Sequence, residues 1–203
     1  MDKVKLAIIF YSMGGTNFQL AKWAAEAATE VDAEVKIFKV PELAPLEVIN
    51  NNPAWKKTTE DTKDIPIPSD DDLMWADAII MSVPTRFGNM ASQMKQFLDT
   101  KGGLWAKGAL VNKVFSAMTS AQNPHGGQEA TILSLYTSMM HWGVIIVPPG
   151  YTDSSIFKAG GNPYGTSVTV DQQGKIGDDV KEAVKYQAKR TIEVAKWIKK
   201  GKD

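Results

Sequence analysis

Short apolar runs alternate with longer amphipathic segments along most of the chain. The apolar runs are too short for buried helices and rich in β-branched residues, so they predict five strands, at 3–11, 34–40, 78–83, 114–118 and 144–147. Segments with apolar residues at helical spacing predict four long helices, one beginning near Asn17 and the others at 90–99, 129–142 and 178–200.

Strands that alternate with helices predict an α/β fold with right-handed crossovers. We therefore expect a doubly wound, five-stranded parallel sheet with helices on both faces, in a single domain spanning 1–203 without a linker or internal repeat. Two irregular stretches, 41–72 and 151–173, are long for connections in such a domain. The first contains a predicted short helix at 46–50 and a helix start at Ser69, which three aspartates follow. We expect both stretches to make assembly contacts and to cover part of a binding site, and disorder is the alternative for the middle of the first.

A doubly wound sheet binds its ligand beyond the carboxyl ends of its strands, and three predicted turns lie there: 12–17, 84–89 and 119–128. The first turn offers hydroxyls, an amide and glycine backbone N–H groups at a helix N-terminus, as an anion requires. It contains no lysine and no G-x-G-x-x-G pattern, so it is neither a P-loop nor a dinucleotide fingerprint. The alternative is a tight connection in which Ser12 or Thr16 merely caps the helix.

The second turn combines groups that suit a flat heterocycle. Pro84 is expected to end the strand, and Arg86 is the sole fixed positive charge in the three turns. Backbone groups of such a turn can bind the polar edge of a ring while Phe87 shields its face. The alternative is a Gly–Asn turn at Gly88 and Asn89 whose phenylalanine belongs to the core. The third turn is again rich in hydroxyls and glycines.

Several longer motifs occur together. They are PTRFGNM at 84–90, GGLWAKGAL at 102–110, GGQE at 126–129, HWGVIIVPPGY at 141–151 and GGNPYG at 160–165. With the order of elements and the first turn, they resemble the flavodoxin-like WrbA family of NAD(P)H:quinone oxidoreductases over essentially the whole chain. The sequence departs from the family pattern at Gly14-Gly15-Thr16, where an aromatic residue, glycine and histidine are usual. It also departs at 121–125, where a run of threonine and glycine is usual.

The resemblance implies noncovalent FMN, with its phosphate in the first turn and its ring against the other two. The implied cofactor-binding residues are Ser12, Met13, Gly14, Gly15, Thr16, Asn17, Pro84, Thr85, Arg86, Phe87, Gly88, Asn89, Thr119, Ser120, Ala121, Gln122, Asn123, Gly126, Gly127 and His141. It assigns catalytic roles to His141 and Trp105, and places Trp105 and Phe87 on the substrate side. From the residues alone, His141 is a helix-end histidine, and Trp105, expected in a loop, either walls a planar pocket or fills a subunit contact.

The implied reaction is a ping-pong cycle. NADH or NADPH passes hydride to the flavin and leaves, and a quinone then takes two electrons. Arg86 and loop N–H groups are expected to stabilise negative charge on the reduced ring. The family also implies a homotetramer whose sites are completed by neighbouring subunits. The alternatives are a one-electron carrier flavodoxin, a flavin-dependent azo- or nitroreductase, and a regulatory module that associates with a tryptophan repressor.

Composition narrows the remaining classes. The 203 residues carry 23 Lys and Arg against 23 Asp and Glu, and this balance favours neither nucleic acid nor an anionic membrane. The absence of cysteine excludes disulfides and a thiol nucleophile within the chain. Two isolated histidines, His125 and His141, predict no metal site, and His125 is assigned no task. The sequence shows no signal peptide or membrane-spanning run, so we expect a cytoplasmic protein without membrane insertion.

Overall fold

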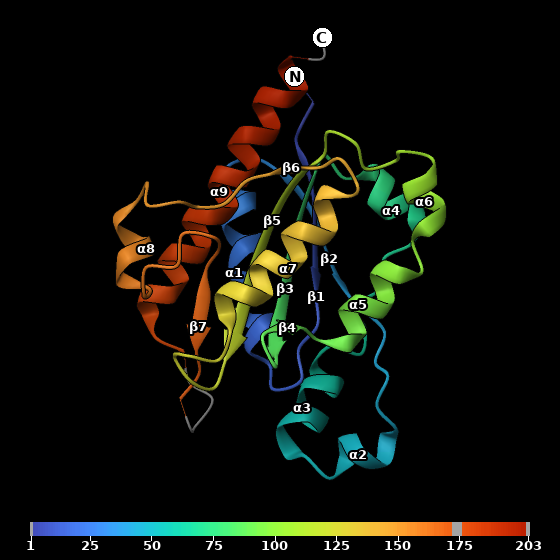
Figure 1. Cartoon of the computed structure of the whole chain (residues 1–203), viewed down its shortest axis with the longest axis vertical. Coiled ribbons are helices and arrows are strands. Elements are labelled where there is room, and N and C mark those ends of the chain that lie inside the picture. The colour runs from blue at the N-terminus through green and yellow to red at the C-terminus, as the bar shows by residue number, and fades with distance from the viewer. Residues whose placement is uncertain (1, 172–175, 202–203) are drawn as a thin grey trace.

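The computed structural model describes residues 2–171 and 176–201. The end of the predicted irregular stretch, at Gln172–Gln173, and the extreme ends of the predicted domain lie outside the described residues. Five parallel strands lie side by side in the order β2-β1-β3-β5-β6, which is the flavodoxin-like order (Figure 1). They are β1 (Lys5–Phe10), β2 (Glu34–Lys39), β3 (Ala78–Arg86), β5 (Val114–Ala121) and β6 (Ile145–Ile146). The predicted doubly wound sheet is confirmed.

Two short strands extend this sheet. β4 (Asn89–Met90) pairs antiparallel with the end of β3, and β7 (Ser167–Thr169) pairs in parallel with the end of β5. The pattern along the chain does not predict either strand, because two or three residues are too few to establish a period.

Helices cover both faces of the sheet. α1 (Thr16–Glu30) and α9 (Asp178–Lys200) pack on one face, and α5 (Ser92–Asp99) and α7 (Gln128–Met140) pack on the other. In β1, Ile8 belongs to the core of the first face and its neighbour Ile9 to the core of the second. Both faces of the strand are buried, which explains its unbroken apolar run.

The central strands run further than predicted. β3 continues through Pro84 to Arg86, so the expectation that Pro84 ends the strand is wrong. The pairing of β3 with β1 stops at Ser82, and a proline beyond that point takes no N–H from a ladder on the β1 side. β5 likewise reaches Ala121, so Thr119 and Ser120 are strand residues and the third turn shortens to 122–127. β6 is only two residues long instead of the predicted four.

The stretch between β2 and β3 is mostly helical. The predicted helix is confirmed as α2 (Leu46–Asn50), and Ser69 caps α4 (Asp70–Trp75) in a reciprocal box with Asp72. A further helix, α3 (Pro53–Asp61), was not predicted, although Asn52 caps it and proline occupies its first position. α2 and α3 lie beyond the carboxyl ends of the strands (Figure 1).

Two short helices lie elsewhere. Trp105 belongs to α6 (Gly102–Ala106) and not to a loop, and that expectation is wrong because the two glycines that open the helix resemble a turn. α8 (Ser154–Lys158) interrupts the stretch before β7. Among the described residues, none of the helices has both the length and the apolar character needed to cross a membrane.

Candidate flavin site at the carboxyl edge of the sheet

The structure brings the three predicted turns together at one edge of the sheet. The Thr85 hydroxyl of the second turn donates to the Gly126 carbonyl of the third at 3.1 Å. Arg86 of the second turn lies against Met13 of the first, with 3.6 Å between Nη2 and Sδ. The turns therefore form one continuous rim.

The first turn leaves donors free at the start of α1. The residue before the helix is Gly15, in the left-handed conformation with φ 89°, and no side chain among the described residues caps the helix. The Ser12 hydroxyl oxygen is buried and has no hydrogen-bond partner in the described part of the chain. These observations exclude the alternative that Ser12 or Thr16 caps α1. An open helix N-terminus beside an unpaired hydroxyl fits the phosphate group of FMN.

Asn17 faces into the protein and not the rim. Its side-chain amide donates to the Ser120 hydroxyl at 2.7 Å. The Ser82 hydroxyl donates to the backbone carbonyl oxygen of Asn17 at 3.1 Å and to its side-chain carbonyl oxygen at 3.2 Å. Asn17 is 1% exposed. This side chain fixes the start of α1 to β3 and β5, a role that sequence spacing does not reveal. Ser82, which was not predicted, belongs to the same network.

The second turn is the tip of the β3–β4 hairpin. Phe87 stands at this tip with φ 52°, and its side chain is fully exposed, at 106%. The alternative that Phe87 belongs to the core is therefore excluded. Arg86 also donates to the Thr85 carbonyl at 2.9 Å, which holds its guanidinium over the first turn. Gly88 and Asn89 complete the hairpin, and the predicted sharp turn lies at these residues.

The third turn packs closely on the second. A Cβ atom on Gly127 would lie 2.6 Å from the Gly88 Cα, so the two backbones meet where no side chain fits. Thr131 of α7 donates to the Thr85 hydroxyl at 2.8 Å and joins the same contact. The exposed residues of this turn are Gln122, Asn123, Pro124 and His125. A cavity of about 700 Å³ adjoins its outer side, lined by His125 and Lys158 among others, but neither Ser12 nor Arg86 lines it.

Tyr11, Glu42 and Gln93 form a polar cluster next to the first turn, which the sequence did not reveal. Tyr11 donates to the Glu42 carboxylate at 3.0 Å, and Gln93 donates to both Tyr11 and Glu42. Burial and the nearby charge of Glu42 raise the pKa of Tyr11, which therefore stays protonated. Partial burial acts to raise the pKa of Glu42, but the N–H of Ala44 and the Gln93 amide outweigh it and hold that pKa below its ordinary value. Glu42 is accordingly a carboxylate at neutral pH.

His141 and Trp105 lie at the other edge of the sheet. His141 follows the last residue of α7, whose first residues adjoin the third turn, and a helix of 13 residues is about 20 Å long. The Trp105 indole N–H donates to the His141 carbonyl at 2.8 Å, and both side chains are exposed. Within one chain, these two residues do not reach the rim.

Comparison with known proteins gives consistent matches. Residues 4–157 match the family model described as NADPH-dependent FMN reductase. Proteins named NAD(P)H dehydrogenase (quinone) are similar to this chain. That of Deinococcus radiodurans is 53% identical, covering 94% of this chain and 95% of the relative. That of Aromatoleum aromaticum is 41% identical, covering 98% and 99%.

Solved structures show the same fold. A flavodoxin, WrbA-like protein from Agrobacterium tumefaciens superposes with a TM-score of 0.69 at 19% identity, covering 96% of this chain and 99% of that chain. Flavodoxin 2 from Bacillus cereus gives a TM-score of 0.62 at 14% identity, covering 94% and 99%.

Proposed function

The chain belongs to the family of NAD(P)H dehydrogenases (quinone), as the motifs indicate, and on this premise we propose that it passes two electrons from NADH or NADPH to a quinone in ping-pong order at the three-turn rim. The observation that carries the location is the buried, unpaired Ser12 hydroxyl beside the uncapped start of α1. When FMN is bound, its ring supplies the hydride and electron chemistry, and the protein supplies binding, orientation and electrostatics.

The residues of the rim divide into two groups by the part of FMN they suit. The Ser12 hydroxyl and the backbone N–H groups of the first turn suit the phosphate, because the helix dipole adds to their hydrogen bonds. The hairpin tip and the third turn suit the ring. Phe87 is exposed and is free to stack on a planar ring or substrate.

Arg86 is placed to balance negative charge. Its guanidinium is held by the Thr85 carbonyl and the Met13 sulfur, so it is oriented before any ligand arrives. We propose that it stabilises the charge that the ring gains on reduction, with help from N–H groups of the third turn.

Trp105 and His141 enter the proposal through assembly. Since they lie about 20 Å from the rim in their own chain, we propose a homotetramer in which they complete the rim of a neighbouring subunit. Between Lys113 and Asp153 the only Asp, Glu, Lys or Arg is Glu129. This stretch includes α7, whose Leu133 and Met140 are exposed.

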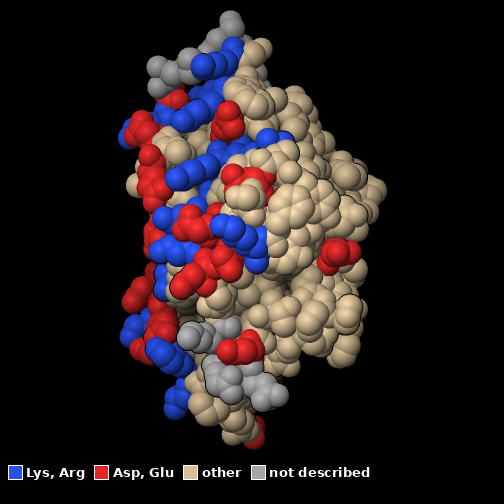
Figure 2. Space-filling model, turned by 90° about the vertical axis from the view of Figure 1, so that its left-hand side faces the viewer, with Lys and Arg blue, Asp and Glu red and all other residues tan. Residues whose placement is uncertain are grey.

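The surface supports such an assembly. Figure 2 shows charged side chains gathered along the left of the view. The right of that view is the face seen from the front in Figure 1, which includes α7, and it has very few charged side chains. An exposed face that is poor in charge and holds large apolar residues is typical of a subunit interface. The nicotinamide nucleotide that the reaction consumes also supports the predicted cytoplasmic location.

A kinetic experiment tests the proposal. The protein is loaded with FMN and mixed with NADH in a stopped-flow spectrometer, and benzoquinone is then added. We expect rapid bleaching of the flavin absorbance, its recovery with benzoquinone, and parallel double-reciprocal plots. A Trp105→Ala variant should lose about tenfold in kcat/KM for the quinone, with Trp197→Ala on the exposed face of α9 as the matched control.

Other outcomes would contradict particular parts of the proposal. A one-electron carrier would not bleach its flavin quickly with NADH. Intersecting double-reciprocal plots would contradict the ping-pong order, and equal activity in Trp105→Ala and wild type would remove Trp105 from the site. A protein that takes up no FMN would contradict the proposal as a whole.

A further inference from the structure

The helix α3 packs directly against the first turn. Thr58 of this helix is 6% exposed, and its Oγ1 would lie 3.5 Å from a Cβ atom placed on Gly15. Glycine suits this position because its φ of 89° strains any side chain, whereas the distance to Thr58 is an ordinary van der Waals contact. α3 therefore forms a wall beside the helix start that is free to receive a phosphate.

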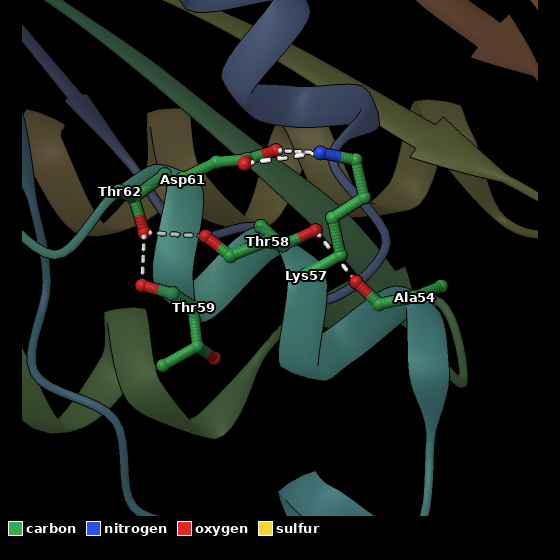
Figure 3. A network of polar contacts seen from close by, with 6 residues as sticks. All are labelled: Ala54, Lys57, Thr58, Thr59, Asp61 and Thr62. Carbon is green, nitrogen blue, oxygen red and sulfur yellow. Dashed lines mark hydrogen bonds and ion pairs between the residues drawn. The ribbon is translucent and has the colours of Figure 1, made fainter.

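This wall has no net charge, and the hydroxyls of Thr58 and Thr62 are already paired. The Thr58 hydroxyl donates to the Ala54 carbonyl at 2.9 Å, and the Thr62 hydroxyl donates to the Thr58 carbonyl at 2.8 Å (Figure 3). Lys57 and Asp61 form an ion pair at 2.8 Å on the same helix. The two lysines and two acidic residues of the helix sum to zero charge, and Thr58 keeps its hydroxyl bonded within the helix, so the helix is suited to exclude water from the phosphate.

One carboxylate ties α3 to the first turn. The Trp55 indole N–H donates to Glu42 Oε2 at 3.0 Å, and the Tyr11 hydroxyl donates to the same oxygen at 3.0 Å. Tyr11 immediately precedes Ser12, so Glu42 joins α3 to the residue that leads into the first turn. Gln93 of α5 occupies the other oxygen at 2.7 Å.

The far end of α3 is fixed separately. The Lys39 ammonium, at the end of β2, donates to the Thr62 carbonyl at 2.6 Å, and the Lys39 backbone N–H donates to the Pro66 carbonyl at 3.0 Å. With both ends fixed near strand termini, α3 cannot tilt away from Gly15 without breaking one of these contacts.

We propose that α3 is a fourth wall of the FMN site, which retains the phosphate end of the cofactor. Thr58 shields that end from water, and Glu42 and Trp55 are positioning residues that hold the helix in place. This inference rests on the proposed function, since it assumes that the first turn binds the phosphate. Its consequence is selective: the wall slows the release of FMN and has little effect on riboflavin, which has the same ring without the phosphate.

The test compares the two flavins on the full-length protein. Trp55→Phe removes only the indole donor, and Glu42→Gln replaces one accepting oxygen by an amide. We expect each variant to release FMN about fivefold faster, as the loss of one such hydrogen bond implies, when release is followed by the fluorescence of freed flavin. The affinity for riboflavin should stay within about twofold of wild type.

Matched substitutions outside the network serve as controls. Glu47→Gln on α2 and Trp197→Phe on α9 make the same chemical changes at exposed positions and should leave both flavins unaffected. Equal loss of FMN and riboflavin binding, or unchanged FMN release in both variants, would overturn the inference while the proposed function stands. A wild-type protein that binds no FMN would overturn both.

Discussion

Two polar side chains of the first turn, Ser12 and Asn17, differ in their hydrogen bonding. The Ser12 hydroxyl is buried without a partner, whereas the amide of Asn17 is fully engaged with Ser82 and Ser120. A buried polar group without a partner costs free energy unless a ligand satisfies it, and a group inside a network supports the fold itself. We therefore expect Ser12 to serve the proposed FMN binding and Asn17 to serve the fold.

This difference gives a prediction for two alanine variants. Ser12→Ala should weaken FMN binding about tenfold and leave the free energy of unfolding of the apoprotein within about 0.5 kcal/mol, because no partner is orphaned. Asn17→Ala should lower that free energy by about 2 kcal/mol, because it removes the donor to the buried Ser120 hydroxyl and one of the two acceptors of the Ser82 hydroxyl. Flavin fluorescence titration and urea unfolding measure the two quantities. Equal destabilisation of the apoprotein by both variants would contradict this division.

At the scale of elements, the rim is assembled by backbone contacts between a hairpin and a turn. The hairpin tip of β3 and β4 and the start of α7 approach each other at Gly88 and Gly127, closer than any side chain allows. Thr85 and Thr131 then link the two elements by hydroxyl groups. The position of the hairpin thus depends on a glycine in a different element.

Gly127→Ala is expected to separate the hairpin from the third turn. Its φ of 85° and the nearness of Gly88 both oppose a methyl group, so the apoprotein should lose about 2 kcal/mol of unfolding free energy and FMN should bind more weakly. Gly103→Ala is the control, because the added methyl meets nothing within 4 Å at the start of α6. Urea unfolding of both variants measures the effect, and a Gly127→Ala protein as stable as the control would refute it.

At the scale of the whole molecule, charge is distributed unevenly. The α1 and α9 face carries interhelical ion pairs such as Lys189 with Glu30 and Lys185 with Glu30. The α7 face has almost none of these groups and exposes Leu133 and Met140. The charged face has the composition of a solvent-exposed surface, and the α7 face has the composition that the proposed subunit interface requires.

Placing charge on the α7 face should therefore dissociate the proposed tetramer. Leu133→Asp and Met140→Asp are expected to shift the mass measured by light scattering from four subunits toward one or two, because a carboxylate would lose its hydration in the interface. Quinone reductase activity should fall, while the first turn of each chain should keep its proposed binding of the FMN phosphate. Glu193→Lys on α9 changes charge on the opposite face and should leave the tetramer intact. A wild-type protein that is monomeric at working concentration would contradict the assembly.

The sequence by itself determined the layers and the position of the rim. Apolar runs such as that of β1 have no polar face, so they require a sheet covered on both sides, and this follows from local composition alone. The turn at 12–17 and the sharp turn at Gly88 were predictable for a similar reason, since conformation at a tight turn depends on the residues in it.

The tertiary structure decided what those local signals leave open. The inward direction of Asn17, the continuation of β3 through Pro84, and the contact of Thr58 with Gly15 all depend on partners far apart in sequence. The same holds for Trp105 and His141, which the length of α7 carries away from the rim. Periodicity and turn chemistry act over a few residues, whereas these placements are fixed by packing and hydrogen bonds between elements, which no local pattern encodes.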